Sequence, residues 1–445
     1  MTEKENNLPE IISVTGTKGK TTIVKLLETV YIRMGRETLL VDTHGHYLNG
    51  EKRGTSKESV NTYGLIPTVC PGRFLHEIKN RDNPLAILET SIGSSGPAGL
   101  GYKSHDIGIL TNVFEDHIGR RIKTKEALAK KKGYIFRRVK TDGVLIFNAD
   151  DPYVVPRVTR SRKIVRRKNA ELLPVGIDFS AFKLSRHLEN GGEALTRKGK
   201  YLVLLSSDGE RKLMNLSSVE WTFFGEYEPA VLNLMMAVAC VYKESKGFPD
   251  VAKKALEEYQ PKEEESGRLL CYRNERKNIS VVVDHAHEKN SIMSLGKLAE
   301  KISGRKTIGV LCFNPDRTDE QLKDCAYHIS NTFNTTIVYD KIDGVDRKPD
   351  KDRRKVYYRG IGEVSNIVYN EMRSYTEEPN RLFKELAEED AIKKALEVAK
   401  EGDLIIHIFG NEGLKSLDML KRIVDVQACS CKDIMREVTD KRKKS

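Results

Sequence analysis

The chain has 445 residues, of which 39% are hydrophobic and 31% are charged, so it is long enough for two or three domains with buried cores. No apolar run approaches the roughly 20 residues that span a bilayer, and the polar first residues lack the apolar core of a secretion signal, so we expect a soluble, cytoplasmic protein that does not bind membranes. The formal net charge of +12 favours anionic partners. Because no recognition helix, zinc finger or aromatic RNA-binding pattern accompanies this charge, nucleic acid is not the expected partner.

The seven cysteines are scattered over the chain, and only Cys429 and Cys431 are close in sequence. An odd number of dispersed cysteines is typical of reduced thiols rather than of a disulfide framework. A Cys-x-Cys pair needs a second pair or a nearby histidine to complete a metal site, and neither is present here. We therefore interpret this stretch as part of a basic tail.

The first predicted element is a strand that leads through a glycine loop into a helix. An apolar run at 11–14 precedes Gly-Thr-Lys-Gly-Lys-Thr-Thr at 16–22, and apolar residues at helical spacing continue to Met34, with Gly35 as the expected cap. Such a loop holds nucleotide phosphates, because its glycines let N–H groups converge on phosphate oxygens while a lysine adds charge and a hydroxyl ligates Mg²⁺. The residues expected to bind ATP or GTP in this way are Gly16, Thr17, Lys18, Gly19, Lys20, Thr21 and Thr22.

The N-terminal half continues as an alternation of strands and helices. Short β-branched runs are predicted to form strands at 38–42, 85–90, 106–113 and 144–149. Their spacing is typical of a mostly parallel sheet with helices on its faces. An Asp-Gly turn within 198–216 predicts a β-hairpin, and helices are expected over 230–243 and 251–259.

A polar stretch, Lys-Glu-Glu-Glu-Ser-Gly at 262–267, indicates a domain boundary. Beyond it, strands are predicted at 279–284, 307–313, 335–340 and 403–409, and helical regions at 320–332 and 381–400. The fold class is therefore α/β. We predict a P-loop-type, mostly parallel ATPase domain over 1–262, a smaller Rossmann-like α/β domain over 263–425, and a basic tail over 426–445.

Three further residues carry candidate chemistry. Glu89 ends a predicted parallel strand, where an acid near a phosphate loop is placed to ligate Mg²⁺. The next strand leads into Thr-Asn-Val-Phe-Glu-Asp-His at 111–117, where His117 is a candidate to ligate or orient a second metal ion, although a lone histidine is more often structural. Lys132 follows fifteen residues later in a lysine run, which by itself indicates a solvated helix face.

The order of these motifs resembles the Mur ligase family, whose relatives include folylpolyglutamate synthetase, poly-γ-glutamate synthase and cyanophycin synthetase. The resemblance covers nearly the whole chain and rests on segments at 16–22, 88–91, 111–117, 132–136, 148–152 and 267–268. The chain looks most similar to the Mur-ligase-like part of cyanophycin synthetase, through segments at 88–93, 99–102, 106–113, 316–320 and 359–363. A mostly parallel ATPase domain followed by a smaller α/β domain is the fold that this resemblance implies.

The resemblance also implies how ATP is bound. Lys20 and the loop amides would hold the phosphates, Asn112 would lie at the nucleotide, and Arg268 and Asp284 would contact ATP from the C-terminal domain. Two segments depart from the family pattern. The residues after Asp284 lack the usual Asn-Pro, and the adenine-side asparagine is displaced to Asn233.

The metal site and the catalytic residues follow from the same resemblance. Thr21, Glu89 and His117 would serve two Mg²⁺ ions, and Lys132 would be a carbamylated lysine that helps to hold the second ion. Lys20, Lys132 and His117 are the residues to which the resemblance gives catalytic roles.

The activity that the resemblance implies is an ATP-dependent carboxylate–amine ligation through an acyl phosphate. We expect an amino acid, arginine or lysine, to be added to an acidic peptide or polymer. The phosphate loop begins after about fifteen residues, so we expect neither a separate N-terminal substrate domain nor an ATP-grasp module, and either a partner protein supplies these functions or the substrate is simpler. Two alternatives stay open: a poly-γ-glutamate synthase-like or other peptide ligase, and a non-catalytic nucleotide-binding subunit of a partner ligase.

Overall fold

The structure is a computed structural model that describes residues 9–54, 60–61, 68–91, 99–115, 122–263, 268–303, 305–315, 317–341, 359–410 and 413–435. The chain divides into two compact units, Met1–Tyr259 and Gln260–Ser445. The division lies close to the polar stretch at 262–267 where we expected a boundary. Within the described ranges, no helix is both long enough and apolar enough to cross a membrane.

The first unit is built on one extended sheet. Its strands are β1 (Glu10–Thr15), β2 (Glu37–Val41), β3 (His46–Leu48), β4 (Glu51–Gly54), β7 (Pro84–Glu89), β8 (His105–Leu110), β9 (Val139–Asn148), β10 (Glu171–Val175), β11 (Ala194–Lys198), β12 (Tyr201–Ser206) and β13 (Gly209–Asn215). They lie in the order β13-β12-β11-β10-β9-β8-β1-β7-β2-β3-β4. The strands from β11 to β2 in this order pair in parallel, whereas both edges are antiparallel. A separate two-stranded piece pairs β5 (Val60–Asn61) with β6 (Thr68–Val69).

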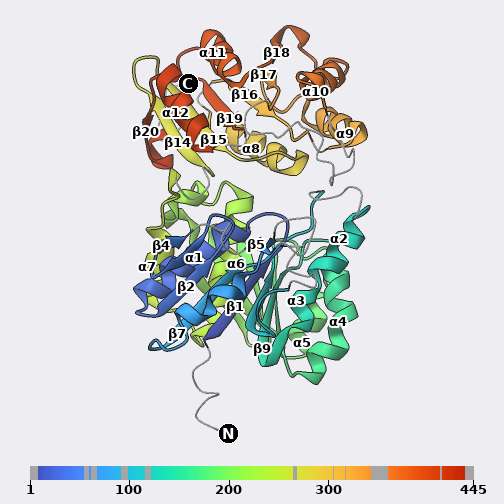
Figure 1. Ribbon diagram of the computed structural model, residues 1–445, viewed down its shortest axis with the longest axis vertical. Helices are drawn as coiled ribbons and strands as arrows, with labels where there is room; N and C mark the ends of the chain where they lie inside the picture. Colours follow the sequence, from blue (N-terminus) through green and yellow to red (C-terminus); the bar gives the residue numbers. More distant parts are fainter. Residues whose placement is uncertain are drawn as a thin grey trace. The chain divides into compact units, whose positions relative to one another are not determined.

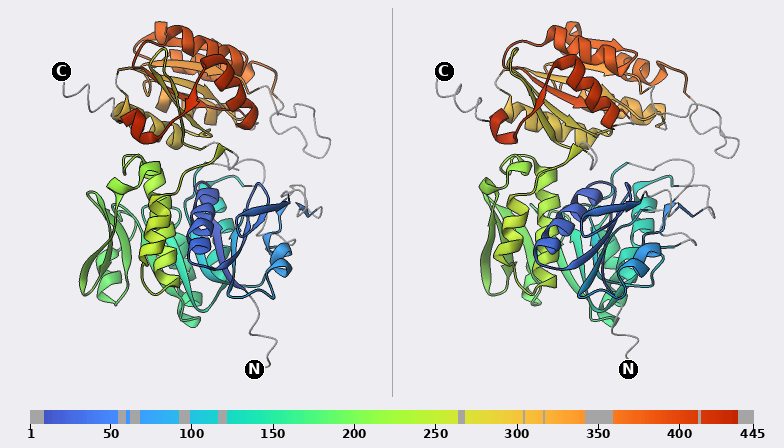
Figure 2. Two further views of the ribbon diagram at one scale, coloured as in Figure 1. Left: turned by 90° about the vertical axis from the view of Figure 1, so that its left-hand side faces the viewer. Right: turned by 60° about the vertical axis from the view of Figure 1, so that its left-hand side comes forward.

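Helices cover both faces of this sheet. They are α1 (Lys20–Arg33), α2 (Lys125–Lys132), α3 (Tyr134–Arg137), α4 (Val155–Arg167), α5 (Leu184–Glu189), α6 (Glu228–Glu244) and α7 (Asp250–Glu257), with 3₁₀ turns at Pro71–Glu77, Leu216–Ser218 and Glu220–Thr222. On one face α1 contacts α6 and α7, and on the other α3 contacts α4 (Figures 1 and 2). Strands between two helical layers are buried on both sides, which explains continuous apolar runs such as Leu-Ala-Ile-Leu in β7.

The second unit is a smaller α/β sheet with the order β18-β17-β16-β19-β15-β14-β20. Its strands are β14 (Leu270–Asn274), β15 (Ile279–Asp284), β16 (Thr307–Cys312), β17 (Thr335–Tyr339), β18 (Leu382–Glu385), β19 (Leu404–Ile408) and β20 (Gln427–Ala428), and its helices are α8 (Lys289–Ile302), α9 (Asp319–Ile329), α10 (Glu363–Arg373), α11 (Glu388–Val398) and α12 (Gly413–Val424), with a 3₁₀ turn at Pro379–Arg381. The strands from β18 to β15 in this order are parallel, and β14 and β20 add an antiparallel edge. Parallel strands joined by α8, α9 and α10 are the crossover connections of a Rossmann-like sheet (Figure 2). The predicted α/β fold class is thus confirmed.

Two stretches of the second unit differ from the expectation. The region 381–400 was expected to be helical, but it begins with β18, which pairs with β17, and only then forms α11. This tertiary pairing overrides the local helix propensity of Leu-Phe-Lys-Glu. The stretch beyond Val426, expected to be a tail, contributes β20 to the sheet and buries Cys431 and Ile434, because strand pairing and apolar burial hold it there.

Candidate active site

The phosphate loop joins β1 to α1 with two glycines in conformations that few other residues adopt. Gly16 has φ +150° and Gly19, the residue before α1, has φ +84°. A Cβ atom at Gly16 would lie 1.8 Å from the Thr111 Oγ1 atom, and one at Gly19 would lie 2.1 Å from the Asn233 Oδ1 atom. Both positions therefore need glycine for space as well as for φ. The N–H groups at the start of α1 form an anion site of the kind that holds phosphate.

Lys20, Thr21 and Glu89 meet at the start of α1. The Thr21 hydroxyl donates to the Glu89 Oε2 atom at 2.8 Å, and the Lys20 Nζ atom lies 3.8 Å from Glu89 Oε1. They meet because β1 and β7 are parallel neighbours, with Val14 opposite Glu89, so that the loop after one strand lies beside the end of the other. Thr43, which the sequence analysis did not single out, also donates to Glu89 Oε1 at 3.1 Å. Its position just after the neighbouring strand β2 is the signal that could have identified it.

Asn112 binds the phosphate loop itself. Its Oδ1 atom accepts from the Lys18 N–H at 2.8 Å, and its Nδ2 atom donates to the Lys18 carbonyl oxygen at 3.2 Å. The Thr111 hydroxyl donates to the same carbonyl oxygen at 2.6 Å, and the Thr17 N–H donates to the Asn112 carbonyl oxygen at 2.9 Å. The side chain of Asn112 thus positions the loop. Thr22 lies on α1 and is half-buried.

Lys132 is the buried member of its lysine run. It ends α2 with 1% of its surface exposed, whereas Lys130 and Lys131 are exposed. Its Nζ atom donates to the Gly16 carbonyl oxygen at 2.5 Å. The lysine that the family resemblance selects therefore reaches the phosphate loop, although it lies 116 residues from Gly16 in sequence.

Tyr134, the first residue of the short helix α3, forms a hydrogen bond to the residue that follows β7. Its hydroxyl donates to Thr90 Oγ1 at 2.5 Å, and the Thr90 hydroxyl donates to the Val14 carbonyl oxygen at 3.1 Å. Burial raises the pKa of Tyr134 to about 12, so this hydroxyl stays a hydrogen-bond donor at neutral pH. Sequence analysis had treated Tyr134 only as part of a matched segment.

Asp151, in the Asn-Ala-Asp-Asp-Pro segment at 148–152, supports the strand end that carries Asn112. Its carboxylate accepts from the Val113 N–H at 2.7 Å and from the Tyr153 N–H at 2.8 Å. Burial raises the pKa of this carboxyl group. The segment therefore holds backbone in place beside the loop.

His117, the candidate ligand of a second metal ion, lies outside the described residues. Within the described parts of the chain, no group of three or more His, Cys, Asp or Glu side chains is arranged to hold a metal ion. The oxygen atoms that meet near the loop are those of Thr21, Thr43 and Glu89.

In the second unit, Arg268 and Asp284 lie next to a strained residue. The Asp284 Oδ2 atom accepts from the Leu269 N–H at 3.2 Å. Leu269 has φ +54°, a left-handed conformation that costs about 1 kcal/mol for such a residue. Among the described residues, the buried Nε atom of Arg268 has no hydrogen-bond partner. A buried guanidinium nitrogen of this kind suits an anionic ligand.

The two C-terminal segments that resemble cyanophycin synthetase contact each other. Arg359 donates to the Arg317 carbonyl oxygen at 2.8 Å, to Asp319 Oδ1 at 2.5 Å and to Glu363 Oε1 at 2.8 Å. Asp316, in the same segment, is outside the described residues. Lys341, which the sequence analysis missed, is buried at the end of β17 and donates to Asn314 Oδ1 at 2.9 Å. This mixed cluster lies at the carboxyl ends of β16 and β17, the edge at which parallel α/β sheets bind ligands.

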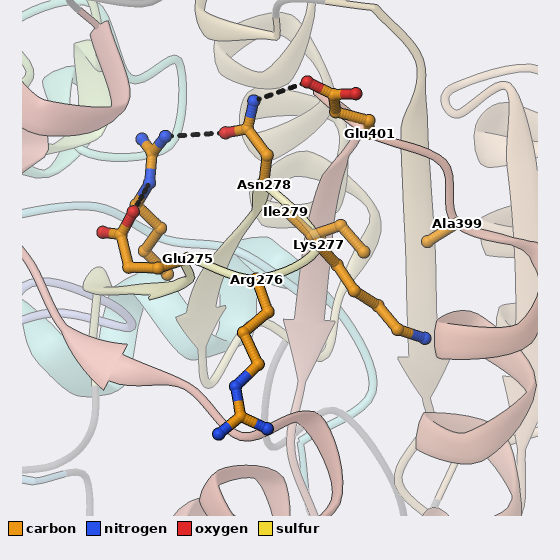
Figure 3. Close-up of a pocket in the computed structure, with 8 residues that line it drawn as sticks. Glu275, Arg276, Lys277, Asn278, Ile279, Ala399 and Glu401 are labelled. Carbon is orange, nitrogen blue, oxygen red and sulfur yellow. Dashed lines mark hydrogen bonds and ion pairs between the residues drawn. The ribbon is translucent and has the colours of Figure 1, made fainter.

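A cavity of about 610 Å³ lies elsewhere in the second unit (Figure 3). It is lined by residues of the β14–β15 turn and of the segment before β19, including Arg273, Glu275, Asn278 and Glu401. Asn278 donates to Glu401 Oε1 at 3.2 Å and accepts from Arg273 at 2.6 Å, so these polar groups satisfy one another. The cavity adjoins the start of β15, whereas Asp284 ends that strand, so the cavity is not the predicted nucleotide site.

Comparisons with known proteins agree on one family. Residues 14–241 match the model of the Mur ligase middle domain. The chain is 26% identical over 420 residues to cyanophycin synthetase of Geminocystis herdmanii (strain PCC 6308), which covers 93% of this chain and 43% of that protein. It is 23% identical over 399 residues to the UDP-N-acetylmuramoyl-L-alanyl-D-glutamate–2,6-diaminopimelate ligase of Aquifex aeolicus (strain VF5). This match covers 89% of this chain and 71% of that ligase. A crystal structure of Mycobacterium tuberculosis folylpolyglutamate synthase complexed with ADP and AMPPCP matches with a TM-score of 0.64 at 14% identity, over 95% of this chain and 92% of that one.

These matches differ in the length that they cover and in what they support. The chain spans less than half the length of the cyanophycin synthetases that it matches. The structural match, at 14% identity, supports the fold. The family model covers slightly more than half of the chain and includes the phosphate loop, Glu89, Asn112 and Lys132. On this basis, the chain belongs to the Mur ligase family.

Proposed function

We propose that the chain is an ATP- and Mg²⁺-dependent carboxylate–amine ligase. The observation that carries this proposal is the meeting of Lys20, Thr21 and Glu89 at the start of α1, with Lys132 on the loop carbonyl of Gly16. A carboxylate oxygen of one substrate attacks the γ-phosphorus of ATP and ADP leaves, which gives an acyl phosphate. The amine of the second substrate then attacks the acyl carbon, loses a proton and displaces phosphate, so that an amide forms.

The residues of the loop bind and orient the phosphates in this proposal. The N–H groups at the start of α1 donate to phosphate oxygens, and the Lys20 ammonium offsets the negative charge of the transferred group. Asn112 keeps the loop in its phosphate-binding shape through its two bonds to Lys18. Positioning and charge stabilisation are the main protein contributions to phosphoryl transfer, and these contacts supply both.

The oxygen atoms of Thr21 and Glu89 fit Mg²⁺. This ion prefers oxygen ligands and completes its shell with phosphate oxygens and water, so one hydroxyl and one carboxylate that lie 2.8 Å apart suit it. When bound, Mg²⁺ would neutralise charge on the β- and γ-phosphates. His117 stays the proposed residue for a second ion.

Lys132 is the proposed site of carbamylation. A carbamylated lysine keeps one N–H, which would retain the bond to the Gly16 carbonyl oxygen, and it exchanges the positive charge for a carboxylate-like group. Such an anionic oxygen ligand fits a second Mg²⁺ ion. The burial of Lys132, in contrast to exposed Lys130 and Lys131, supports this assignment.

Arg268 and Asp284 are proposed to hold ATP from the second unit. The buried Nε atom of Arg268 that lacks a partner among the described residues supports this role, because a phosphate oxygen would supply an acceptor. The strained backbone at Leu269 is supported on Asp284, as expected where a backbone is held for binding.

The proposed substrates are an acidic peptide or polymer and an amino acid, arginine or lysine. The likeness to proteins named cyanophycin synthetase over most of this chain supports this choice. The net charge of +12 favours an acidic acceptor. The cluster of Arg359 with Asp319 and Glu363 presents both charges, as an amino acid does, which supports this choice.

The test is ADP release from the purified chain with Mg²⁺-ATP and a matrix of acidic peptides and single amino acids. Mass spectrometry of the products accompanies each reaction. We expect ADP release that needs both a carboxylate and an amine, with a matching mass increase. Product that contains glutamate but never arginine or lysine would replace the proposed amino acid, and ATP binding without turnover under every condition would contradict ligation by the chain alone.

A lysine pair supplies the matched control. Lys20→Ala is expected to abolish nucleotide-dependent activity, whereas Lys163→Ala, which removes an exposed lysine of α4, should leave it unchanged. Normal turnover in Lys20→Ala would remove Lys20 from the proposed mechanism.

A further inference from the structure

Three cysteines gather at the antiparallel edge of the second sheet. β14 and β20 pair with Tyr272 opposite Ala428, and one step further the Cys429 N–H donates to the Cys271 carbonyl oxygen at 2.9 Å. The Sγ atoms of Cys271 and Cys431 lie 3.3 Å apart, although 160 residues separate them in sequence. The sequence showed only the Cys-x-Cys pair at 429 and 431, so the third thiol comes from the fold.

We propose that Cys271 and Cys431 form a reversible disulfide that fastens the C-terminal segment 427–435 to β14. A sulfur–sulfur bond is about 2.05 Å long, so the two sulfurs need to approach by only about 1.2 Å from their present separation. The pairing of β14 with β20 already holds the two segments that carry these cysteines side by side.

The surroundings select this pair among the three thiols. Cys271 and Cys431 are both buried and their sulfurs are in contact, whereas Cys429 is half-exposed. The expected product is therefore the crosslink between Cys271 and Cys431, with Cys429 left reduced.

The chemistry needs a disulfide oxidant of low molecular weight, such as glutathione disulfide. One thiolate attacks the oxidant, which forms a mixed disulfide and releases one thiol. The second thiolate then attacks the protein sulfur of that mixed disulfide and releases the second thiol. Two protein thiols thus lose two electrons and two protons, and the oxidant is reduced to two thiols.

The crosslink would stabilise the edge of the sheet that begins the second unit. The Tyr272 hydroxyl, next to Cys271, donates to Glu263 Oε1 at 2.5 Å, and Lys421 of α12 donates to Glu263 Oε2 at 2.7 Å. β14, α12 and the stretch that carries Glu263 are therefore already linked by polar contacts. A covalent link from β14 to the segment after α12 would add a further connection at this edge of the sheet.

The experiment uses the full chain, incubated with increasing ratios of oxidised to reduced glutathione. Remaining thiols are alkylated under denaturing conditions and located by mass spectrometry of peptides. We expect the number of thiols to fall from seven to five, with the crosslink between the peptides that carry Cys271 and Cys431. The thermal midpoint should rise on oxidation and return when dithiothreitol is added.

Variants separate this crosslink from unspecific oxidation. Cys431→Ser and Cys271→Ser should each abolish both the crosslink and the rise in thermal midpoint, whereas Cys429→Ser and Cys312→Ser should retain them. Because Cys271 lies in a strand, Cys431→Ser is the decisive variant if the other does not fold. Seven alkylated thiols at every ratio, a glutathione adduct on Cys429 without a crosslink, or a crosslink that survives in Cys431→Ser would each overturn the proposal.

Discussion

Replacing Lys132 with methionine tests the link between this lysine and the phosphate loop. The change removes a buried ammonium group while it keeps a similar side-chain volume, so no large cavity forms. The lost bond is the one from Nζ to the Gly16 carbonyl oxygen at 2.5 Å. A hydrogen bond to a charged group contributes roughly 1.5–3 kcal/mol. The free energy that favours the ordered, phosphate-binding conformation of the loop should fall by about this much, which corresponds to roughly 10- to 150-fold weaker ATP binding.

Two measurements distinguish a role in the loop from a role in the chemistry. Titration of ATP by calorimetry reports binding, and ADP release under saturating ATP reports kcat. A lysine that only holds the loop would change binding within the range above and leave kcat nearly unchanged. If Lys132 is carbamylated and acts in the chemistry, its replacement would also lower kcat. Added bicarbonate would then not restore the activity of Lys132→Met or Lys132→Ala.

The control is Lys131→Met, which removes a neighbouring exposed lysine from the same helix. We expect its turnover and ATP binding to match those of the unmodified chain. Normal ATP binding together with normal turnover in Lys132→Met, or an equal loss in Lys131→Met, would refute the reasoning.

Three further predictions address the loop, the metal and the core. Gly16→Ala should weaken ATP binding by at least about tenfold in a nucleotide titration, because the new Cβ would lie 1.8 Å from Thr111 Oγ1 in a loop with φ +150°; unchanged binding would contradict the observed loop. Glu89→Gln should raise the Mg²⁺ concentration for half-maximal ADP release by at least about tenfold, and an unchanged Mg²⁺ profile would exclude Glu89 as a ligand. Burial lowers the pKa of His105 to about 3, so below about pH 6.5 the unfolded chain binds a proton that the folded chain does not. The free energy of unfolding should therefore fall by roughly 1.6 kcal/mol from pH 6.5 to 5. His105→Leu should reduce this fall in urea unfolding at the two pH values, and an equal fall in the variant would assign it to other groups.

Local sequence patterns were sufficient to predict the phosphate loop and the acidic residue beside it. The glycines, lysine and threonines at 16–22 lie in one short stretch, and Glu89 ends an apolar strand, so both can be identified without knowledge of tertiary contacts. The choice of Lys132 came from a resemblance, because the spacing of three adjacent lysines does not show which one is buried. The structure distinguishes them, since Lys132 alone of the three turns inward.

Contacts between distant segments were beyond such patterns. The expectation that Asn112 lies at the nucleotide did not include its side-chain bond to Lys18, which forms because β8 and β1 are neighbours and the loops after them meet. β18 was expected to be helical, and only its pairing with β17 makes it a strand. The contact of Cys271 with Cys431 likewise depends on a strand pair that closes over 160 residues. No periodicity in the sequence encodes these pairings.

The strand order explains why residues spread over the sequence form one site. β8, β1, β7 and β2 are successive parallel neighbours, so the loops after them lie along one edge of the sheet. Asn112, Lys20, Glu89 and Thr43 each follow one of these strands or end it, which places a loop clamp, a cation, a carboxylate and a hydroxyl side by side. Lys132 joins them from α2, which follows β8 in sequence. A substitution that disturbs the pairing of β1 with β7 should therefore weaken the Lys20–Glu89 and Thr21–Glu89 contacts together, although it touches none of these side chains.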